Sequence, residues 1–498
     1  MSEAPLILGV SGLRGIVGES LTPEVAARYA GAFGAWLKAK WGWAEEVVVA
    51  RDGRAGGDAV YHSVISGLSS AGMHVRAIDV ATTPTAGLAL GAAAGAIVVT
   101  ASHNPGEWNG LKCLVLFDEG DVGGRAPSQA EAEEIIARFR GSDSSADSPA
   151  GSVDHVGNDE AIDYHVAICN SRYRACVGDG PGELAAQEFC AVLDSVNASG
   201  AQAAEALLGE IGARAVQLFG DGSGVFPHPP EPTRENLSGR GGLCDAVPGL
   251  KADVGFAQDP DADRLAIVDE LGSYIGEEYT LVLAAASLLE ARDSSRLEAG
   301  STKTGPVIVT NLSTSRMIDD VAAHYGSRVV RTAVGEANVV ERMKALKEQG
   351  EDVVLGGEGN GGVIWPEVVY VRDSLGAMAL TLALMARTGK KVSELVSWID
   401  SMAGEGGGGY AIVKRKVDIP TKEAAAPAIE AVRKACEGES GAVVDLQDGV
   451  RVDWPGQRAW AHVRASNTEP IMRLIGEAPS EAEAEALLAR VEAMIAGG

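Results

Sequence analysis

The chain has 498 residues, of which 46% are hydrophobic and 22% charged, and its formal net charge is −27, from 42 Lys and Arg against 69 Asp and Glu. This length is too great for one hydrophobic core and predicts three or four domains. The acidic balance supplies no basic stripe, so we expect no nucleic-acid partner, and any anionic ligand must find a local cationic pocket.

Cysteine usage and hydropathy exclude further classes of protein. The six cysteines are scattered and form no C-x-x-C pair, so neither a structural zinc site nor a disulfide framework is indicated. The N-terminal residues lack the features of a signal peptide, and no run of 18 apolar residues predicts a membrane span. We therefore expect a cytoplasmic protein with no membrane partner.

Strand-like and helix-like segments alternate from the N-terminus. Residues 6–10 predict a strand, and residues 11–15 a glycine-rich loop that carries Arg14. A helix is expected to residue 38, with Thr22 as its N-cap and Pro23 at its first position. Strands are predicted at 47–50 and 74–78, with a helix between them that ends near residue 70. Continuous β-branched runs of this kind indicate largely parallel sheets covered by helices on both faces.

The apolar residues 95–99 predict a buried strand that stops at Thr-Ala-Ser-His-Asn-Pro, residues 100–105. Ser102 is thereby placed on a loop at a strand end, with His103 beside it and Lys112 ten positions on. A hydroxyl is a weak nucleophile until a base activates it, so a serine near proton carriers is a candidate nucleophile. An ordinary polar turn fits the same residues, and the motif alone does not decide between the two.

Composition marks two boundaries. Residues 141–152 are rich in Ser, Gly and Pro and predict a linker. Strands at 216–219 and 307–310, each followed by a small polar loop, suggest that an α/β unit recurs. Beyond the glycines at 404–409 the pattern changes to strands at 410–417, 459–463 and 472–475 and helices at 422–436 and 480–496, which predicts a smaller α+β domain.

Residues 259–264, Asp-Pro-Asp-Ala-Asp-Arg, hold carboxylates at alternate positions, which can converge on one side of an extended segment. Clustered carboxylates repel one another unless a cation lies among them, and hard oxygen ligands suit Mg²⁺ or Ca²⁺. An EF-hand also begins this way and would end at Glu270. However, Arg264 stands where an EF-hand needs glycine, and the flanking residues are strand-like. A solvated acidic turn is the remaining alternative.

Two loops carry groups suited to a phosphosugar. Residues 356–362 combine glycines with Glu358 and Asn360, which can bond vicinal hydroxyls. Residues 464–470, Arg-Ala-Ser-Asn-Thr-Glu-Pro, with Arg473 beyond them, gather donors suited to a dianionic phosphate. Each loop alone also fits a flexible turn or a surface loop with ion pairs.

Together these stretches, with residues 11–15, resemble the α-D-phosphohexomutase family from end to end, five motifs in family order. The resemblance implies three similar α/β/α domains with mixed, largely parallel sheets and a C-terminal α+β domain, around a central cleft. We place the domains at 1–150, 151–274, 275–404 and 405–498.

The resemblance also implies roles for single residues. Ser102 would be a phosphoserine and, with the carboxylates of Asp259, Asp261 and Asp263, a ligand of Mg²⁺. The candidate proton carriers are His103 and Lys112, and Arg14 would stabilise the transferring phosphate. The implied substrate-binding residues are Arg264, Glu358, Asn360, Arg464, Ser466, Asn467, Thr468 and Arg473.

The implied activity interconverts hexose 6-phosphate and hexose 1-phosphate through a 1,6-bisphosphate intermediate. The chain departs from many members at Asn360, Gly362, Ala333 and Asn467, positions that concern substrate preference. It looks like a branch assigned as phosphoglucosamine mutase or phosphomannomutase, and we favour glucosamine phosphate. A Mg²⁺-dependent sugar phosphatase and a silent sugar-phosphate-binding protein are the alternatives. The expected partner is a small phosphosugar, and the expected state is a monomer or homodimer.

Overall fold

The computed structural model describes residues 4–117, 123–141, 149–178, 189–296, 305–403, 407–466 and 471–497. The chain divides into two compact units, the first formed by residues 1–300 with 354–395 and the second by residues 301–353 with 396–498. Among the described residues, no helix is both long and apolar enough to cross a membrane. The predicted α/β class is confirmed by the alternating helices and strands.

The first unit contains a seven-stranded sheet in the order β1-β2-β6-β5-β3-β4-β7. The strands are β1 (Leu6–Gly9), β2 (Gly12–Ile16), β3 (Glu46–Arg51), β4 (His74–Val80), β5 (Gly95–Val99), β6 (Trp108–Val115) and β7 (Val153–His155). Strands β3, β4, β5 and β7 run parallel to one another, whereas β1, β2 and β6 pair in antiparallel fashion. The sheet is therefore mixed. Its parallel strands place their carboxyl ends along one edge.

The predicted glycine-rich loop at residues 11–15 is wrong, because Gly12–Ile16 form strand β2. A tight hairpin brings Gly9 opposite Gly12, which has a φ of 100°. A Cβ atom on Gly12 would lie 2.0 Å from the carbonyl oxygen of Leu111 on the neighbouring strand β6. Glycine is required here because the two backbones approach so closely. Arg14 consequently extends from a strand.

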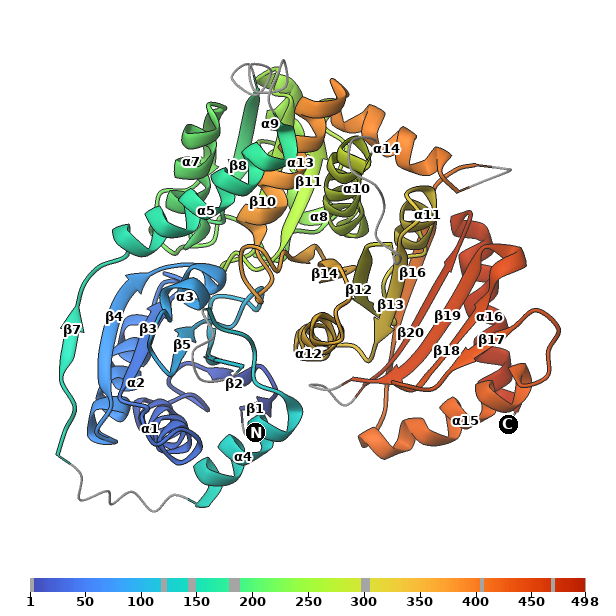
Figure 1. The fold of residues 1–498 in the computed structure, drawn as a ribbon. Helices are drawn as coiled ribbons and strands as arrows, with labels where there is room; N and C mark the ends of the chain where they lie inside the picture. Colours follow the sequence, from blue (N-terminus) through green and yellow to red (C-terminus); the bar gives the residue numbers. More distant parts are fainter. Residues whose placement is uncertain are drawn as a thin grey trace. The chain divides into compact units, whose positions relative to one another are not determined.

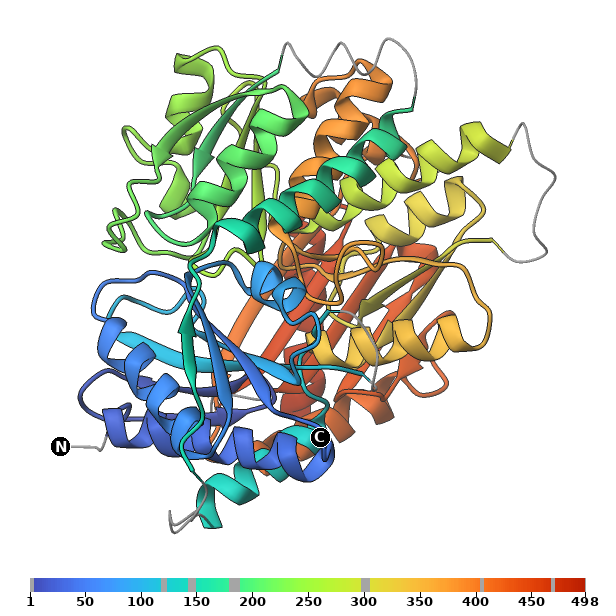
Figure 2. The ribbon, with the colours of Figure 1, turned by 60° about the vertical axis from the view of Figure 1, so that its left-hand side comes forward.

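Helices cover both faces of this sheet (Figure 1). They are α1 (Pro23–Lys40), α2 (Asp58–Ser70), α3 (Thr83–Ala89) and α4 (Gln129–Gly141). Helices α1 and α2 pack against each other (Figure 2), and Thr22 caps α1 as predicted, its side chain accepting from the N–H of Val25. Leu111 and Cys113 belong to the apolar core that includes α1 and α2. Since side chains alternate along a strand, Lys112 points to the opposite face.

The chain returns to the first sheet after the predicted linker at residues 141–152. Ser152 accepts a backbone hydrogen bond from Val75, and β7 follows at Val153–His155 on the outer side of β4. Residues 142–148 of the linker lie outside the described part of the chain. Helix α5 (Asp159–Val177) comes next and leads into a second sheet.

The second sheet has four strands in the order β11-β10-β8-β9. The strands are β8 (Cys190–Asp194), β9 (Arg214–Phe219), β10 (Val254–Gln258) and β11 (Leu265–Asp269), and the helices are α7 (Gly200–Ile211), α8 (Arg234–Leu237) and α9 (Leu243–Gly249). The acidic stretch at 259–264 connects β10 to β11, which pair in antiparallel fashion. Strands flank it on both sides, so the EF-hand alternative is wrong.

The rest of the first unit comprises helix α10 (Glu277–Arg296), the antiparallel pair β14 (Val353–Glu358) and β15 (Gly362–Ile364), and helix α13 (Ser374–Thr388). Helix α13 packs against both α5 and α10. Nearly all of its side chains are buried, which is why its sequence is apolar on every face.

The second unit contains a parallel pair and a separate antiparallel sheet. The parallel pair is β12 (Val307–Asn311) and β13 (Arg328–Thr332), with helices α11 (Met317–His324) and α12 (Glu336–Glu348). Helix α14 (Val392–Ser401) follows α13 in the chain. The antiparallel sheet has the order β16-β20-β19-β18-β17.

The five antiparallel strands are β16 (Ala411–Asp418), β17 (Val443–Asp445), β18 (Val450–Trp454), β19 (Ala459–Ala465) and β20 (Ile471–Ala478). The helical segments are η2 (Lys422–Ala425), α15 (Ala426–Cys436), η3 (Pro455–Gln457) and α16 (Glu481–Gly497). One apolar core joins α15 and α16 to the sheet. The predicted α+β character of this region is confirmed, although the sequence analysis did not predict β17 and β18.

Candidate active site

Ser102 lies directly beyond the carboxyl end of β5, as the sequence predicts. Its backbone has a φ of 49°, in the left-handed region that serine rarely adopts, and its side chain is buried. The N–H of Ser102 donates to Thr100 Oγ1 at 2.8 Å, and Ser102 Oγ donates to Asp259 Oδ2 at 2.6 Å. Strained backbone of this kind is often found at functional sites, and here it turns the hydroxyl toward the acidic cluster.

A buried ion pair between Arg54 and Asp52 holds the Ser102 loop in place through hydrogen bonds to its backbone. Arg54 Nε donates to Asp52 Oδ2 at 2.8 Å, and both side chains are 1% exposed. Arg54 Nη2 donates to the carbonyl oxygen of Ser102 at 2.5 Å, while Arg54 Nη1 donates to that of Trp108 at 2.8 Å. Asp52 also accepts from Thr100 Oγ1 at 2.7 Å. One arginine therefore holds both arms of the loop that presents the serine.

The acidic stretch folds so that its three carboxylates converge. Asp259, Asp261 and Asp263 are each fully buried and offer oxygens that lie within 4.8 Å of one another. Lys112 Nζ donates to Asp261 Oδ2 at 2.9 Å and to Asp263 Oδ2 at 2.5 Å. The alternative of a solvated acidic turn is therefore wrong, because the three side chains are removed from water.

Two residues that the sequence analysis missed also hold the cluster. Thr83 Oγ1 donates to Asp261 Oδ2 at 2.6 Å. Arg372 donates to Asp263 Oδ2 at 2.5 Å through Nη2 and to Glu358 Oε2 at 2.8 Å through Nη1. Arg372 thus links a carboxylate of the acidic cluster to the acid of the predicted sugar loop.

The pKa values of the cluster diverge. Burial, reinforced by repulsion from Asp263 and Asp261, raises the pKa of Asp259 well above its ordinary value. Burial also opposes ionisation of Asp263, but Arg372 and Lys112 outweigh it and lower the pKa of that carboxyl. The pKa of Asp261 is lowered in the same way by Lys112 and Thr83. Such divergence within one cluster is typical of functional sites.

The donor set fits a hard divalent cation. Asp261 Oδ1 and Asp263 Oδ1 are buried, and no donor among the described residues gives either oxygen a hydrogen bond, although Arg264 Nε forms a longer ion pair with Asp263 Oδ1 at 3.7 Å. A buried carboxylate oxygen without a partner is costly, and a cation bound to it removes that cost. Three carboxylates with a serine oxygen beside them form an all-oxygen set, which suits Mg²⁺ better than softer metals.

The predicted catalytic residues His103 and Arg14 contact the Ser102 loop, and the predicted substrate-binding residue Arg264 contacts the acidic cluster. His103 Nδ1 lies 3.3 Å from Ser102 Oγ, and burial together with Arg264 and Arg14 lowers the pKa of this imidazole well below its ordinary value. The imidazole is therefore held in its neutral form, and its lowered pKa makes it a weaker proton acceptor than an ordinary histidine. Arg14 Nη1 donates to Asn104 Oδ1 at 2.9 Å, and the N–H of Arg264 donates to Asp259 Oδ1 at 3.1 Å.

The predicted sugar loop forms the turn between β14 and β15. Glu358 is 4% exposed, at the end of β14. Asn360 Oδ1 accepts from the N–H of Gly362 at 3.2 Å, so this amide shapes the turn. A Cβ atom on Gly359 would lie 2.0 Å from Glu278 Oε2, so a larger residue there would require the Glu278 side chain to move. Glu358 joins the acidic cluster through Arg372.

The predicted phosphate loop lies in the second unit. Arg464 on β19 faces Arg473 on β20 in the antiparallel register. Arg464 Nε donates to Asp448 Oδ2 at 2.8 Å, while its buried Nη2 finds no hydrogen-bond partner in the described part of the chain. Directly opposed like charges destabilise a sheet unless an anion neutralises them. Ser466 is buried at the end of β19, and the predicted residues Asn467 and Thr468 lie outside the described residues.

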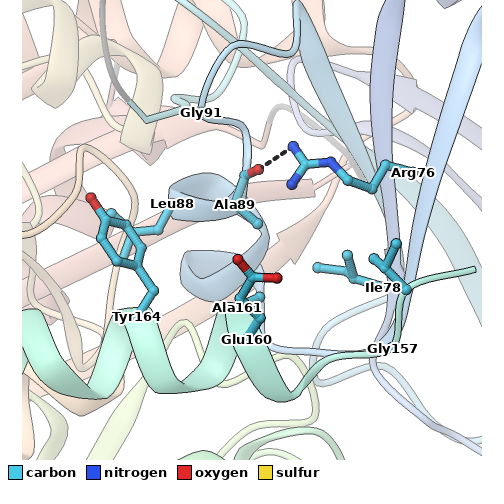
Figure 3. A pocket seen from close by; sticks show the side chains of 10 residues that line it. Arg76, Ile78, Leu88, Ala89, Gly91, Gly157, Glu160, Ala161 and Tyr164 are labelled. Carbon is cyan, nitrogen blue, oxygen red and sulfur yellow. Dashed lines mark hydrogen bonds between the residues drawn. The ribbon is translucent and has the colours of Figure 1, made fainter. Parts of the chain in front are cut away.

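A cavity of about 250 Å³ lies elsewhere in the first unit, between β4, α3 and the start of α5 (Figure 3). Arg76 is the only cationic residue that lines it. Its guanidinium already donates to Glu46 Oε1 at 3.0 Å and to the carbonyl oxygen of Ala89 at 2.7 Å. None of the predicted site residues lines this cavity, and its arginine is engaged in holding the chain together.

Sequence signals for the missed residues differ in strength. Asp52 and Arg54 directly follow β3, which runs parallel to β5. Because neighbouring parallel strands end at the same edge of a sheet, the stretch 51–54 could have been placed beside Ser102. Thr83 and Arg372 have no local signal of this kind, since their partners lie 178 and 109 residues away in the chain.

Comparison with known families gives matches along most of the chain. Four phosphoglucomutase/phosphomannomutase models match in order: α/β/α domain I at residues 5–145, domain II at 182–272, domain III at 277–402 and the C-terminal domain at 412–494. The domain limits predicted from composition and the family resemblance together were 1–150, 151–274, 275–404 and 405–498, and they stay a prediction.

Individual relatives span nearly the whole chain. The phosphoglucomutase/phosphomannomutase of Thermococcus kodakarensis is 33% identical over 97% of this chain and 96% of its own length. A Methanopyrus kandleri protein named "Probable phosphoglucosamine mutase" is 34% identical over 96% of this chain and 95% of its own. The crystal structure of a phosphoglucomutase/phosphomannomutase family protein from Burkholderia thailandensis covers 97% of this chain and 95% of that one, with 25% identity and a TM-score of 0.73.

Proposed function

The chain belongs to the phosphoglucomutase/phosphomannomutase family and is a phosphohexomutase, an isomerase that transfers phosphate within its substrate, and we propose that its substrate is glucosamine phosphate. The proposal is that it interconverts the 6-phosphate and the 1-phosphate. The observation that carries the mechanism is the 2.6 Å hydrogen bond between Ser102 Oγ and Asp259, beside two buried carboxylate oxygens that accept no hydrogen bond from the described residues.

In the proposed mechanism Ser102 is the phosphate carrier. The bond between Ser102 Oγ and phosphorus breaks as the free hydroxyl of a bound sugar phosphate forms a bond to the same phosphorus. The proton of that hydroxyl passes to the neutral imidazole of His103, or to Lys112 in its neutral amine form, and a proton is delivered to Ser102 Oγ as it leaves. The resulting 1,6-bisphosphate then reorients in the site. The bond between its other phosphorus and the sugar oxygen breaks as Ser102 Oγ bonds to that phosphorus, and the proton carrier takes the Ser102 proton and delivers it to the released sugar oxygen.

In this proposal the remaining site residues bind the metal ion and the sugar phosphate and neutralise the charge of the phosphate groups. Asp259, Asp261 and Asp263 would hold Mg²⁺ with an oxygen from Ser102, and the bound ion supplies charge neutralisation for the transferring group. Arg14 and Arg264 add positive charge near the serine. Glu358 and Asn360 would accept and donate to sugar hydroxyls, while Arg464 and Arg473, with Ser466, Asn467 and Thr468, would bind the phosphate that is not reacting.

Support for glucosamine phosphate comes from the relative named phosphoglucosamine mutase, at 34% identity. The relative named phosphoglucomutase/phosphomannomutase, at 33% identity, supports mannose or glucose phosphate as the alternative. The three sugars differ at C2, where glucosamine carries an amine in place of a hydroxyl and mannose carries a hydroxyl of opposite orientation. Binding sites discriminate such small differences through a few hydrogen bonds. A cytoplasmic location stays a prediction.

The test is turnover with glucosamine 6-phosphate, mannose 6-phosphate and glucose 1-phosphate in parallel, with Mg²⁺ and the matching 1,6-bisphosphate as primer. We expect the highest kcat/KM with glucosamine 6-phosphate and no release of inorganic phosphate. A higher value with either other sugar would replace the proposed substrate. Stoichiometric phosphate release would identify a phosphatase, and binding without turnover a silent binding protein.

A further inference from the structure

A chain of buried hydrogen bonds lies beside the acidic cluster, within the first unit. His165 on α5 is fully buried, and its Nε2 lies 3.0 Å from Asp373 Oδ2. Its Nδ1 lies 2.9 Å from Thr85 Oγ1, which in turn lies 2.7 Å from Thr82 Oγ1. Asp373 is the N-cap of α13, and Thr82 is the N-cap of α3. A single imidazole therefore joins the starts of two helices.

The hydrogen bonds have a consistent direction. Because a carboxylate only accepts, Nε2–H of His165 donates to Asp373, which leaves Nδ1 to accept from the Thr85 hydroxyl. The Thr85 oxygen can then accept from Thr82. Every polar atom along this path has a partner, as buried polar groups require.

Residues next to both ends of this path hold carboxylates of the acidic cluster. Thr83, which follows Thr82, donates from Oγ1 to Asp261 Oδ2 at 2.6 Å and from its N–H to the Asp261 carbonyl at 2.9 Å. Arg372, which precedes Asp373, donates to Asp263 Oδ2 at 2.5 Å. A displacement of either helix start would therefore move one of the two carboxylates relative to the other.

A second metal site is the rival explanation, because His165, Cys169 and Asp373 present ligand atoms within 4.8 Å of one another. However, Asp373 already accepts from the N–H of Leu375 at 2.9 Å and that of Gly376 at 3.0 Å, as an N-cap does. Cys169 Sγ is 3.8 Å from Asp373 Oδ2, a weak hydrogen bond from a thiol. Structural zinc takes four ligands, and the described residues supply three here.

We propose that His165 is a positioning residue for the metal site, acting through Asp373 and Thr85 on the separation of Asp261 and Asp263. This inference rests on the proposed Mg²⁺ site. Residues that orient metal ligands from behind tune metal affinity without touching the ion. Removing a hydrogen bond from this path should therefore raise the Kd for Mg²⁺. The increase should be larger than in a control variant that loses a similar amount of folding stability.

The experiment measures the Kd for Mg²⁺ by isothermal titration calorimetry on the full chain, with Tm measured in parallel. We expect His165→Leu to raise the Kd about tenfold. The matched control is Cys176→Ala, a buried cysteine about three turns further along α5, which should lower Tm but change the Kd less than twofold. His165→Gln, which can still donate to Asp373, should recover part of the affinity.

Thr85→Val keeps the side-chain volume and removes the hydroxyl, so it tests the path even if His165→Leu fails to fold. It should raise the Kd about threefold or more. An unchanged Kd in folded Thr85→Val and His165→Gln would overturn the inference. Stoichiometric zinc in the unchanged protein, lost from His165→Gln and Cys169→Ala alike, would overturn it in favour of a second metal site. If the unchanged protein bound no Mg²⁺, the proposed Mg²⁺ site would itself be wrong, and the inference with it.

Discussion

Ser102 Oγ donates a 2.6 Å hydrogen bond to Asp259 Oδ2, across 157 positions of sequence. A phosphate ester on that oxygen would replace a neutral donor with a dianion facing three buried carboxylates. Such an arrangement is unfavourable unless a cation lies between the phosphate and the carboxylates. Phosphorylation of Ser102 and occupancy of the metal site are therefore expected to depend on each other.

The first prediction concerns the proposed carrier. Ser102→Ala removes the hydroxyl that donates to Asp259 Oδ2, so kcat should fall at least about 10³-fold. Peptide mass spectrometry of the unchanged protein should find phosphate on Ser102. Far-UV circular dichroism should show the variant folded. Retention of more than a few per cent of the turnover by Ser102→Ala would contradict the role.

The second prediction concerns metal removal. Dialysis against a chelator should abolish mutase turnover, and added Mg²⁺ should restore it, because Asp261 and Asp263 each keep a buried oxygen that accepts no hydrogen bond from the part of the chain that the structure describes. Asp261→Asn should raise the Kd for Mg²⁺ about 10- to 100-fold. Asp245→Asn, on the exposed part of α9, is the control and should leave the Kd unchanged. Full turnover after exhaustive chelation would exclude a metal requirement.

The third prediction compares two neighbouring arginines. Arg54→Met leaves Asp52 charged and unpaired in a site 1% exposed, so it should lower the free energy of unfolding by about 3–5 kcal/mol. Arg51→Met breaks pairs with Asp58 and Asp79, whose side chains are 71% and 56% exposed, and should cost about 1 kcal/mol or less. Urea denaturation measures both values. Equal losses would show that the Asp52–Arg54 pair does not support the Ser102 loop in the way we infer.

The sequence predicted the site residues whose roles are visible in a short stretch of chain and missed those whose roles depend on distant segments. Ser102 and the three aspartates were found because the strand ending and the alternate carboxylates are visible within a few residues. Arg372 and Thr83 were missed because their roles depend on chain segments more than 100 residues away. Strand β2 was predicted as a loop for the same reason. Its hydrogen-bond partners come from β1 and β6, and a glycine-rich segment of five residues does not reveal them.

The fourth prediction concerns acid stability and Glu131 on α4. Burial would raise the pKa of this carboxyl, but the two hydrogen bonds from Arg125, at 2.6 and 3.0 Å, and the pair with Lys40 lower it to about 2. Because the pKa is lower in the folded protein than in the unfolded chain, where it is 4.5, Glu131 stabilises the fold fully at pH values above 4.5. This stabilisation is lost as the pH falls from 4.5 toward 2.

Glu131→Gln should therefore lower the free energy of unfolding by about 2 kcal/mol at pH 7, with the difference from the unchanged protein shrinking below about pH 4. Urea denaturation at pH 7, 4 and 3 measures this. Glu133→Gln, exposed on the same helix, is the control and should show no such trend. A difference that stays constant to pH 3 would contradict the assignment.

The fifth prediction concerns the proposed phosphate site in the second unit. Arg464 is held by Asp448 through Nε, which leaves the end of its guanidinium to face an anion together with the opposed Arg473. Arg464→Lys keeps the charge but loses the planar fork, so KM for the sugar phosphate should rise about tenfold with a smaller change in kcat. Arg458→Lys, at the other end of β19 and paired with Tyr410, is the control and should leave KM within twofold. Steady-state kinetics at saturating Mg²⁺ separates the two parameters. A fall in kcat at unchanged KM would instead place Arg464 in the chemical step, because an interaction made only in the transition state lowers kcat without weakening substrate binding.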